Sequence, residues 1–220
     1  MNSRERILKA LNHEPVDRVP VDLGGTRQSG IAMETYQRLR QALEIRTDSP
    51  FKVFDLFQLL AEIEPEMAGR FQSDTVPLNR PKVAFGIPNR DWKPFRFFKG
   101  PDVLVPGAFH PETDTDGSLV LKKQGQVIAR LPRDGYYFDR FEPYPGASHP
   151  DLSAWQPPRI SEAELEHYHA ESIRLYEETD KAVIAAMGPP YELFNGIGQG
   201  GFEDWMITFA TEDEYVEELY

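Results

Sequence analysis

The chain has 220 residues, of which 40% are hydrophobic, and this is enough to form a sizeable core. Its net charge of −12 argues against broad binding to nucleic acids or anionic membranes, and its lack of cysteine excludes disulfides, thiol catalysis and cysteine-bound metal within these residues. No apolar run approaches the length of a membrane span and no leader sequence precedes Ser3, so we expect a soluble cytoplasmic protein.

The first 78 residues alternate between strand and helix patterns. Asn2 and Glu5 form a predicted capping box, which opens an entry helix. The elements that follow are a strand at 19–23, a helix from about 32, a strand at 51–54 ending at Asp55, a helix from 56 interrupted near Pro65, and a strand at 75–78. Such alternation is typical of a parallel sheet with crossover helices. We therefore assign residues 1–78 to the entry helix and the first β/α units of a barrel.

Residues 79–158 have a different character, rich in proline and aromatic side chains. Eleven of the nineteen prolines fall between Pro77 and Pro150. Apolar runs at 119–121 and 127–131 follow the turn signal Asp116-Gly117, which favours antiparallel pairing. We interpret this region as an insertion that contains a β-hairpin.

Residues 159–220 return to the β/α pattern. Ser161 and Glu164 predict a second capping box, at the start of a helix that runs to about 179, and a strand follows at 181–187. A glycine-rich turn, the segment 202–210 and a helix from Thr211 complete the chain, which stops at Tyr220. Four parallel-type strands cannot close a barrel. We therefore expect an α/β fold that is the N-terminal half of something larger, truncated at Tyr220.

Two side chains at predicted strand ends are candidates for binding and catalysis. Arg27, followed by Gln28, lies in a glycine-flanked loop after the first strand, and its guanidinium suits a carboxylate or a phosphate. The alternative is a surface arginine in a turn. Asp55 ends the second strand, where a carboxylate can stabilise positive charge or hold a cationic substrate. Its alternative role is to cap the next helix, since aspartate is a good N-cap.

Three further patterns are poor evidence for a site. Residues 196–201 match G-x-G-x-x-G, but they lie well past their strand and no ribose-binding acid can follow. Acidic residues from Glu112 resemble the start of a calcium loop, yet its twelfth position is Lys123. His167 and His169 are two apart on a helix and cannot chelate together. No metal site is predicted within this stretch.

Several segments resemble the uroporphyrinogen decarboxylase superfamily, whose fold is a (β/α)8 TIM barrel. The opening SRERILKALNHEPVDRVP (3–20) is similar to that family's entry helix and first strand, and RQSG (27–30) is similar to its R-Q-A-G loop. GPPYEL (188–193), followed by Gln199 and Gly200, resembles its G-x-P-[FW]-T-L segment. The resemblance implies substrate-binding roles for Arg27, Gln28 and Tyr191, and a central active-site role for Asp55.

Departures from the decarboxylase pattern favour another reaction. The decarboxylases carry a second arginine where Ile31 stands, and the register places their active-site tyrosine at Gly196. Without those donors some of the substrate carboxylates have no hydrogen-bonding or charge partner, which disfavours porphyrinogen decarboxylation in heme biosynthesis. RLPRDGYYFD (130–139) resembles the corrinoid-linked methyltransferase branch. The resemblance therefore implies methyl transfer or demethylation of a small methylated substrate, with zinc and a corrinoid in the full-length protein and a corrinoid protein as partner.

A third hypothesis is not enzymatic. A half-barrel leaves strand edges unpaired and an apolar interior uncovered. The chain would then be a non-catalytic fragment or split subunit that needs a C-terminal partner, and we expect it to be inactive alone and to self-associate as a homo-oligomer or aggregate.

Overall fold

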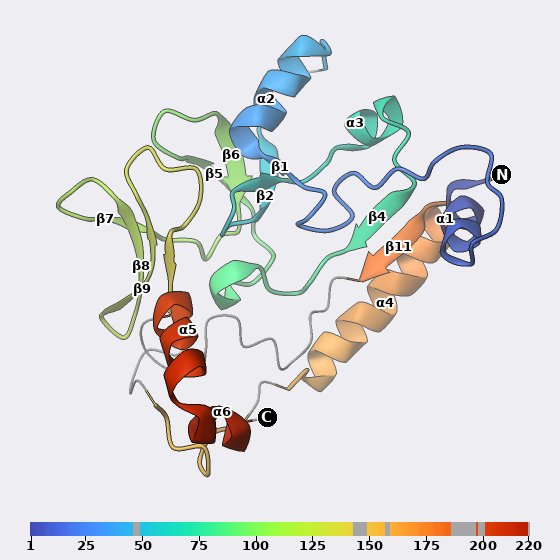
Figure 1. Ribbon diagram of the computed structural model, residues 1–220. Helices are drawn as coiled ribbons and strands as arrows, with labels where there is room; N and C mark the ends of the chain where they lie inside the picture. The colour runs from blue at the N-terminus through green and yellow to red at the C-terminus, as the bar shows by residue number, and fades with distance from the viewer. Residues whose placement is uncertain (46–48, 143–148, 157–158, 186–196, 198–200, 220) are drawn as a thin grey trace. The chain divides into compact units, whose positions relative to one another are not determined.

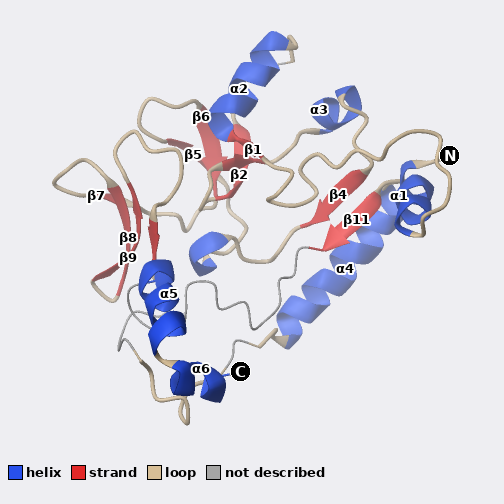
Figure 2. Ribbon diagram, viewed as in Figure 1, coloured by secondary structure: helices blue, strands red, loops and turns tan. Residues whose placement is uncertain are grey.

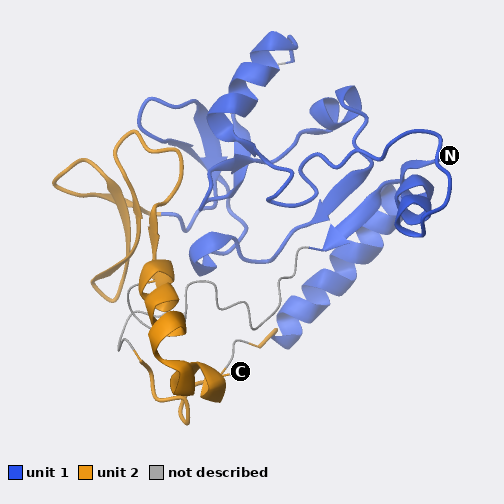
Figure 3. Cartoon of the chain, viewed as in Figure 1, with its two compact units in different colours: residues 1–109, 161–187 blue, residues 110–160, 188–220 orange. Residues whose placement is uncertain are grey.

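The computed structural model describes residues 1–45, 49–142, 149–156, 159–185, 197 and 201–219 (Figure 1). The chain divides into two compact units (Figure 3). Unit 1 comprises Met1–Phe109 and Ser161–Met187, and unit 2 comprises His110–Ile160 and Gly188–Tyr220. Every candidate site residue that the structure describes belongs to unit 1.

One part of unit 1 is a parallel strand pair with helices packed on it. β4 (Thr75–Leu78) and β11 (Ala182–Ala185) run parallel, with Thr75 opposite Ala182. α4 (Glu162–Glu178) contacts both strands and α1 (Ser3–Leu11) contacts β11 (Figure 2). The capping boxes predicted at both helix starts are confirmed. Each satisfies backbone N–H groups that a helix start leaves unpaired.

The rest of unit 1 is built on a five-stranded sheet in the order β1-β3-β2-β6-β5. Its strands are β1 (Ile31–Ala32), β2 (Phe51–Asp55), β3 (Leu60–Ala61), β5 (Lys93–Arg96) and β6 (Asp102–Val105). Only β2 and β6 pair in parallel within this sheet, and the other three pairings are antiparallel. The remaining elements are α2 (Met33–Ala42), α3 (Pro65–Arg70) and the 3₁₀ turn η1 (Ala84–Gly86). Val53 and Val103 are fully buried in the sheet.

Unit 2 pairs an antiparallel sheet with two helices. The sheet order is β10-β9-β8-β7, formed by β7 (Glu112–Thr113), β8 (Leu119–Lys123), β9 (Gln126–Leu131) and β10 (Arg140–Phe141). β8 and β9 form a hairpin within the segment that the sequence assigns to one. α5 (Gly201–Thr211) and α6 (Asp213–Leu219) follow, and Trp205 of α5 packs with Ile197 in a small apolar core.

The predicted half of a (β/α)8 TIM barrel is wrong. In the part of the chain that the structure describes, the sheets have five, four and two strands and most pairings are antiparallel. The structure first differs from the predicted barrel at residues 19–23, which do not form a strand. Pro20 has no backbone N–H to donate to a neighbouring strand. The backbone N–H groups of Val21 and Leu23 donate instead to the side chains of Asp74 and Ser73.

The second departure follows Asp55, where a helix was predicted. The chain instead turns back within four residues and pairs β3 antiparallel to β2. Asp55 favours this turn because its carboxylate accepts a hydrogen bond from the Gln58 backbone.

No described helix is both long and apolar enough to span a bilayer.

Candidate functional site

Arg27 and Gln28 are carried at the tip of a closed loop. The Gly24 N–H donates to the Ser29 carbonyl at 3.0 Å, and the Gly30 N–H donates to the Arg27 carbonyl at 3.1 Å. Gly24 has a φ of +75°, in the left-handed region that glycine adopts without steric cost. These bonds define the shape of the loop and leave the side chains of Arg27 and Gln28 exposed.

A carboxylate and a hydroxyl support the base of this loop. Oδ1 of Asp22 accepts hydrogen bonds from the Thr75 hydroxyl at 2.6 Å and from the Gly25 N–H at 3.0 Å. A Cβ at Gly25 would lie 2.4 Å from that Asp22 oxygen and 2.8 Å from the Thr75 hydroxyl. A side chain at this position would therefore displace Asp22 or Thr75, whose hydrogen bond links the loop to the start of β4. Sequence reasoning missed Asp22 and Thr75.

Asp55 is nearly buried and lies next to Arg27. Its Oδ1 accepts a hydrogen bond from the Gln58 backbone N–H at 2.8 Å, and its Oδ2 lies 3.6 Å from Arg27 Nε. The Asp55 side chain is 6% exposed, whereas that of Arg27 is 46% exposed. Two residues predicted independently, Arg27 in the loop after residues 19–23 and Asp55 at the end of β2, thus lie next to each other as an ion pair. The capping alternative for Asp55 holds only in part, since its backbone partner lies in a turn rather than a helix.

The turn after Asp55 contains a strained residue. Leu59 has a φ of +52° although it is branched and 1% exposed. Such a conformation costs on the order of 1–3 kcal/mol and persists only where the surroundings enforce it. Here the Leu59 carbonyl accepts a hydrogen bond from the Met33 N–H at 2.8 Å.

The arrangement leaves hydrogen-bonding capacity for a ligand. Arg27 directs Nε toward Asp55, and within the described ranges its two terminal Nη groups have no protein partner. A guanidinium held in this way presents a planar pair of donors that matches a carboxylate or a phosphate. The site can therefore bind an anionic group next to a fixed carboxylate.

The other residues that the sequence analysis singled out add little to the Arg27–Asp55 site. Gln28 is exposed beside Arg27, and Ile31 pairs with Ala61 in the β1–β3 ladder. Tyr191 and Gly196 lie outside the described residues.

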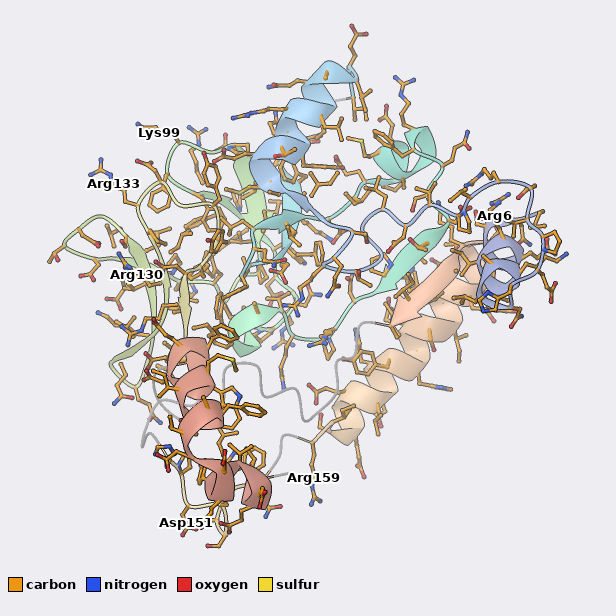
Figure 4. All side chains as sticks on the ribbon, viewed as in Figure 1. Arg6, Lys99, Arg130, Arg133, Asp151 and Arg159 are labelled. Atoms are coloured by element: carbon orange, nitrogen blue, oxygen red, sulfur yellow. The ribbon has the colours of Figure 1, made fainter. Side chains whose placement is uncertain are left out.

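A second charged cluster lies at the start of β4 and ties the N-terminal segment to it. Asp74 is fully buried and accepts hydrogen bonds from Arg6 Nη1 (2.6 Å), Arg18 Nη1 (2.7 Å) and the Val21 N–H (2.9 Å). Arg6, a residue of α1 labelled in Figure 4, also binds both oxygens of Asp17. These contacts link segments that are far apart in sequence, and we interpret them as structural.

The same contacts shift the pKa values of both carboxyl groups. Burial alone would raise the pKa of Asp74, but hydrogen bonds from Val21, Arg18 and Arg6 lower it overall. The hydrogen bonds from the Arg6 guanidinium likewise hold the pKa of Asp17 well below its usual range. Both groups are therefore ionised at neutral pH.

The resemblance implies zinc for the full-length protein, not for a site within these residues. Among the described residues, no three histidine, aspartate or glutamate side chains lie close enough together to hold a metal ion. The imidazole of His167 lies 3.0 Å from the Asn79 carbonyl and that of His149 lies 3.3 Å from the Thr208 hydroxyl, which are contacts typical of structural histidines.

Comparison with known proteins found no matching family model, no matching curated protein and no matching solved structure. The resemblance to the uroporphyrinogen decarboxylase superfamily therefore rests on the sequence motifs alone.

Proposed function

We propose that this chain binds the anionic group of a small organic molecule through Arg27. The observation that carries the proposal is the Arg27–Asp55 pair, in which Nε lies 3.6 Å from a nearly buried carboxylate while the Arg27 side chain is 46% exposed. The charge of Asp55 attracts the guanidinium and restricts where it lies, which reduces the side-chain entropy lost when an anion binds. A carboxylate or phosphate oxygen pair can then be held by both Nη groups.

Asp55 gives this site a chemical function beyond binding. A carboxylate removed from water stabilises positive charge that develops nearby more strongly than an exposed carboxylate does. It can also accept a hydrogen bond from the part of the ligand next to the anionic group. Asp55 is thus the residue of this pair to which we assign the catalytic role.

The reaction we propose is the one that the resemblance implies, methyl transfer or demethylation of a small methylated substrate. The motif similarity at 130–139 supports it, together with the departures from the decarboxylase pattern at Ile31 and Gly196. The role that we assign to the described residues in that reaction is to bind and orient the substrate, through Arg27 and Asp55. A corrinoid protein as partner stays a prediction.

Isothermal titration calorimetry with acetate and inorganic phosphate as probes tests the binding step. We expect Arg27→Ala to weaken binding of the preferred probe roughly 10- to 100-fold, as for loss of a charge-assisted hydrogen bond. Arg38→Ala is the matched control, because Arg38 is an exposed arginine of α2 in the same unit. Equal affinities for wild type and Arg27→Ala, or no binding of either probe, would show that Arg27 is an ordinary surface residue.

The reaction class needs a separate assay on the protein purified from its native source. With a reduced corrinoid and small methylated carboxylates, methyl transfer predicts a methylcorrinoid product. With a porphyrinogen, a product that has fewer carboxyl groups would instead support the decarboxylase alternative.

A further inference from the structure

Helix α5 of unit 2 has two neighbouring stripes of residues, and only one of them is buried. The buried stripe consists of Gly201, Trp205 and Thr208. The second stripe consists of the residue that follows each of these, Phe202, Met206 and Phe209. Spacings of four and three residues place the members of a stripe on one face of a helix. The residues of this second stripe, the α5 stripe, are 48%, 41% and 51% exposed.

The α5 stripe has the composition of the centre of a protein–protein interface. Phenylalanine and methionine are enriched in such interfaces, and three of these side chains on one helix face form a patch rather than scattered exposed residues. The ring of Phe209 also lies 6.3 Å from that of the buried Trp205, centroid to centroid. The α5 stripe therefore continues the small apolar core of unit 2 to its surface.

The segment that carries the α5 stripe has only negative charge. Residues 201–219 contain seven acidic side chains and no lysine, arginine or histidine. All seven are exposed, and none of them forms an ion pair with another described residue. Glu203 lies three residues before Met206, and Glu212 and Asp213 follow the end of α5, so carboxylates lie at both ends of the stripe. Bringing positive charge to this segment would relieve the repulsion among them.

We infer that the α5 stripe is the docking site for a basic amphipathic helix of a partner protein. The apolar face of such a helix covers the stripe, and its lysine or arginine side chains face the carboxylates at both ends. The charge disfavours a second copy of this chain, because a two-fold contact would place the same acidic segment against itself. The inference does not depend on Arg27, which belongs to unit 1.

Three synthetic peptides separate the apolar contribution from the charge contribution. The first, the Leu–Lys peptide, is about 14 residues long, or four helical turns, with leucines on one face and lysines on the other. The second has the same composition in scrambled order, and the third has glutamate in place of every lysine. In protein labelled at its methionine methyl groups, the Met206 resonance should shift saturably with the Leu–Lys peptide. By fluorescence anisotropy, the other two peptides should bind roughly tenfold more weakly or not at all.

Met206→Ala is the decisive variant, because alanine is a good helix former and removes most of the apolar side chain. It should weaken binding of the Leu–Lys peptide about tenfold, with an unchanged circular dichroism spectrum. Ile207→Ala is the matched control. Ile207 is 58% exposed in the same helix, but consecutive residues do not share a helix face, so its affinity should change by less than about twofold.

A second pair of variants tests the charges. Glu203→Gln combined with Asp213→Asn should weaken binding of the Leu–Lys peptide roughly threefold and make it less dependent on salt concentration. Glu166→Gln combined with Glu177→Gln removes two exposed acidic side chains from α4 instead. This control should change neither the affinity nor its salt dependence.

The inference is overturned if the scrambled peptide binds as tightly as the Leu–Lys peptide, or if Met206→Ala binds as tightly as the wild type. Analytical ultracentrifugation tests the other occupant. A concentration-dependent dimer of the wild type that is lost in Met206→Ala would identify a second copy of the chain on the α5 stripe and would contradict the inference, which predicts the same sedimentation for both proteins.

Discussion

Replacing Asp74 by asparagine tests whether the buried charge cluster holds the N-terminal segment on β4. Asp74 is fully buried and binds Arg6, Arg18 and the Val21 backbone. The variant keeps the volume of the side chain but removes its charge, which leaves Arg6, at 6% exposure, with only Asp17 as counter-charge. Removing one partner of a buried ion pair costs about 3–5 kcal/mol.

The lower end of that range applies here. Arg18 is about one-third exposed and can regain water, and Arg6 keeps Asp17. We therefore expect Asp74→Asn to lower the free energy of unfolding by about 3 kcal/mol. For a chain of this size that corresponds to a decrease in Tm of roughly 6–12 °C. Urea unfolding followed by circular dichroism measures the first quantity, and a thermal melt measures the second.

Asp17→Asn is the matched control, because the Asp17 side chain is 46% exposed and also binds Arg6. An exposed pair contributes about 1 kcal/mol or less. The reasoning is refuted if Asp74→Asn costs less than about 1 kcal/mol, or no more than Asp17→Asn, since burial would then not set the strength of the cluster.

Three further predictions concern pH, the loop and a helix start. Folding lowers the pKa values of Asp17 and Asp74, so their stabilising effect is present above about pH 4 and is lost as the pH falls below it. The urea midpoints measured at pH 7 and at pH 3 should therefore differ less in Asp74→Asn than in the wild type. Gly25→Ala would place a Cβ 2.4 Å from a carboxylate oxygen, so we expect a loss of about 1–3 kcal/mol in unfolding and weaker acetate binding by calorimetry. Unchanged affinity would mean that the loop adapts. Ser161→Ala removes the cap of α4 and should cost about 1 kcal/mol in the same urea assay, whereas Ser161→Asp should cost less.

Local features were predictable from the sequence. Both capping boxes depend on residues three apart, Asn2 with Glu5 and Ser161 with Glu164, and both are present. Arg27 and Asp55 were predicted as site residues because each follows a short apolar run, and in the structure their side chains form an ion pair. Short-range hydrogen bonds can be recognised without knowledge of tertiary contacts, whereas the strand expected at 19–23, before Arg27, did not form.

Long-range partners were not predictable in the same way. Asp22 and Thr75 are 53 residues apart, and Arg6 and Asp74 are 68 apart, so no local pattern links them. The barrel prediction failed at the residues after Asp55, whose apolar side chains are compatible with a helix. In the structure they form a turn in which Leu59 adopts a positive φ, a conformation enforced by tertiary contacts that propensity does not anticipate.

The most direct test of the Arg27 site is the side-chain Nε–H resonance of Arg27 in isotope-labelled protein titrated with acetate. Our account predicts a saturable shift of this resonance that is retained in Arg38→Ala, while Arg27→Ala loses the resonance together with the acetate-induced shift of the Gly25 N–H. A resonance that does not move, or a Gly25 shift that persists in Arg27→Ala, would contradict the assignment of Arg27 as the anion-binding group.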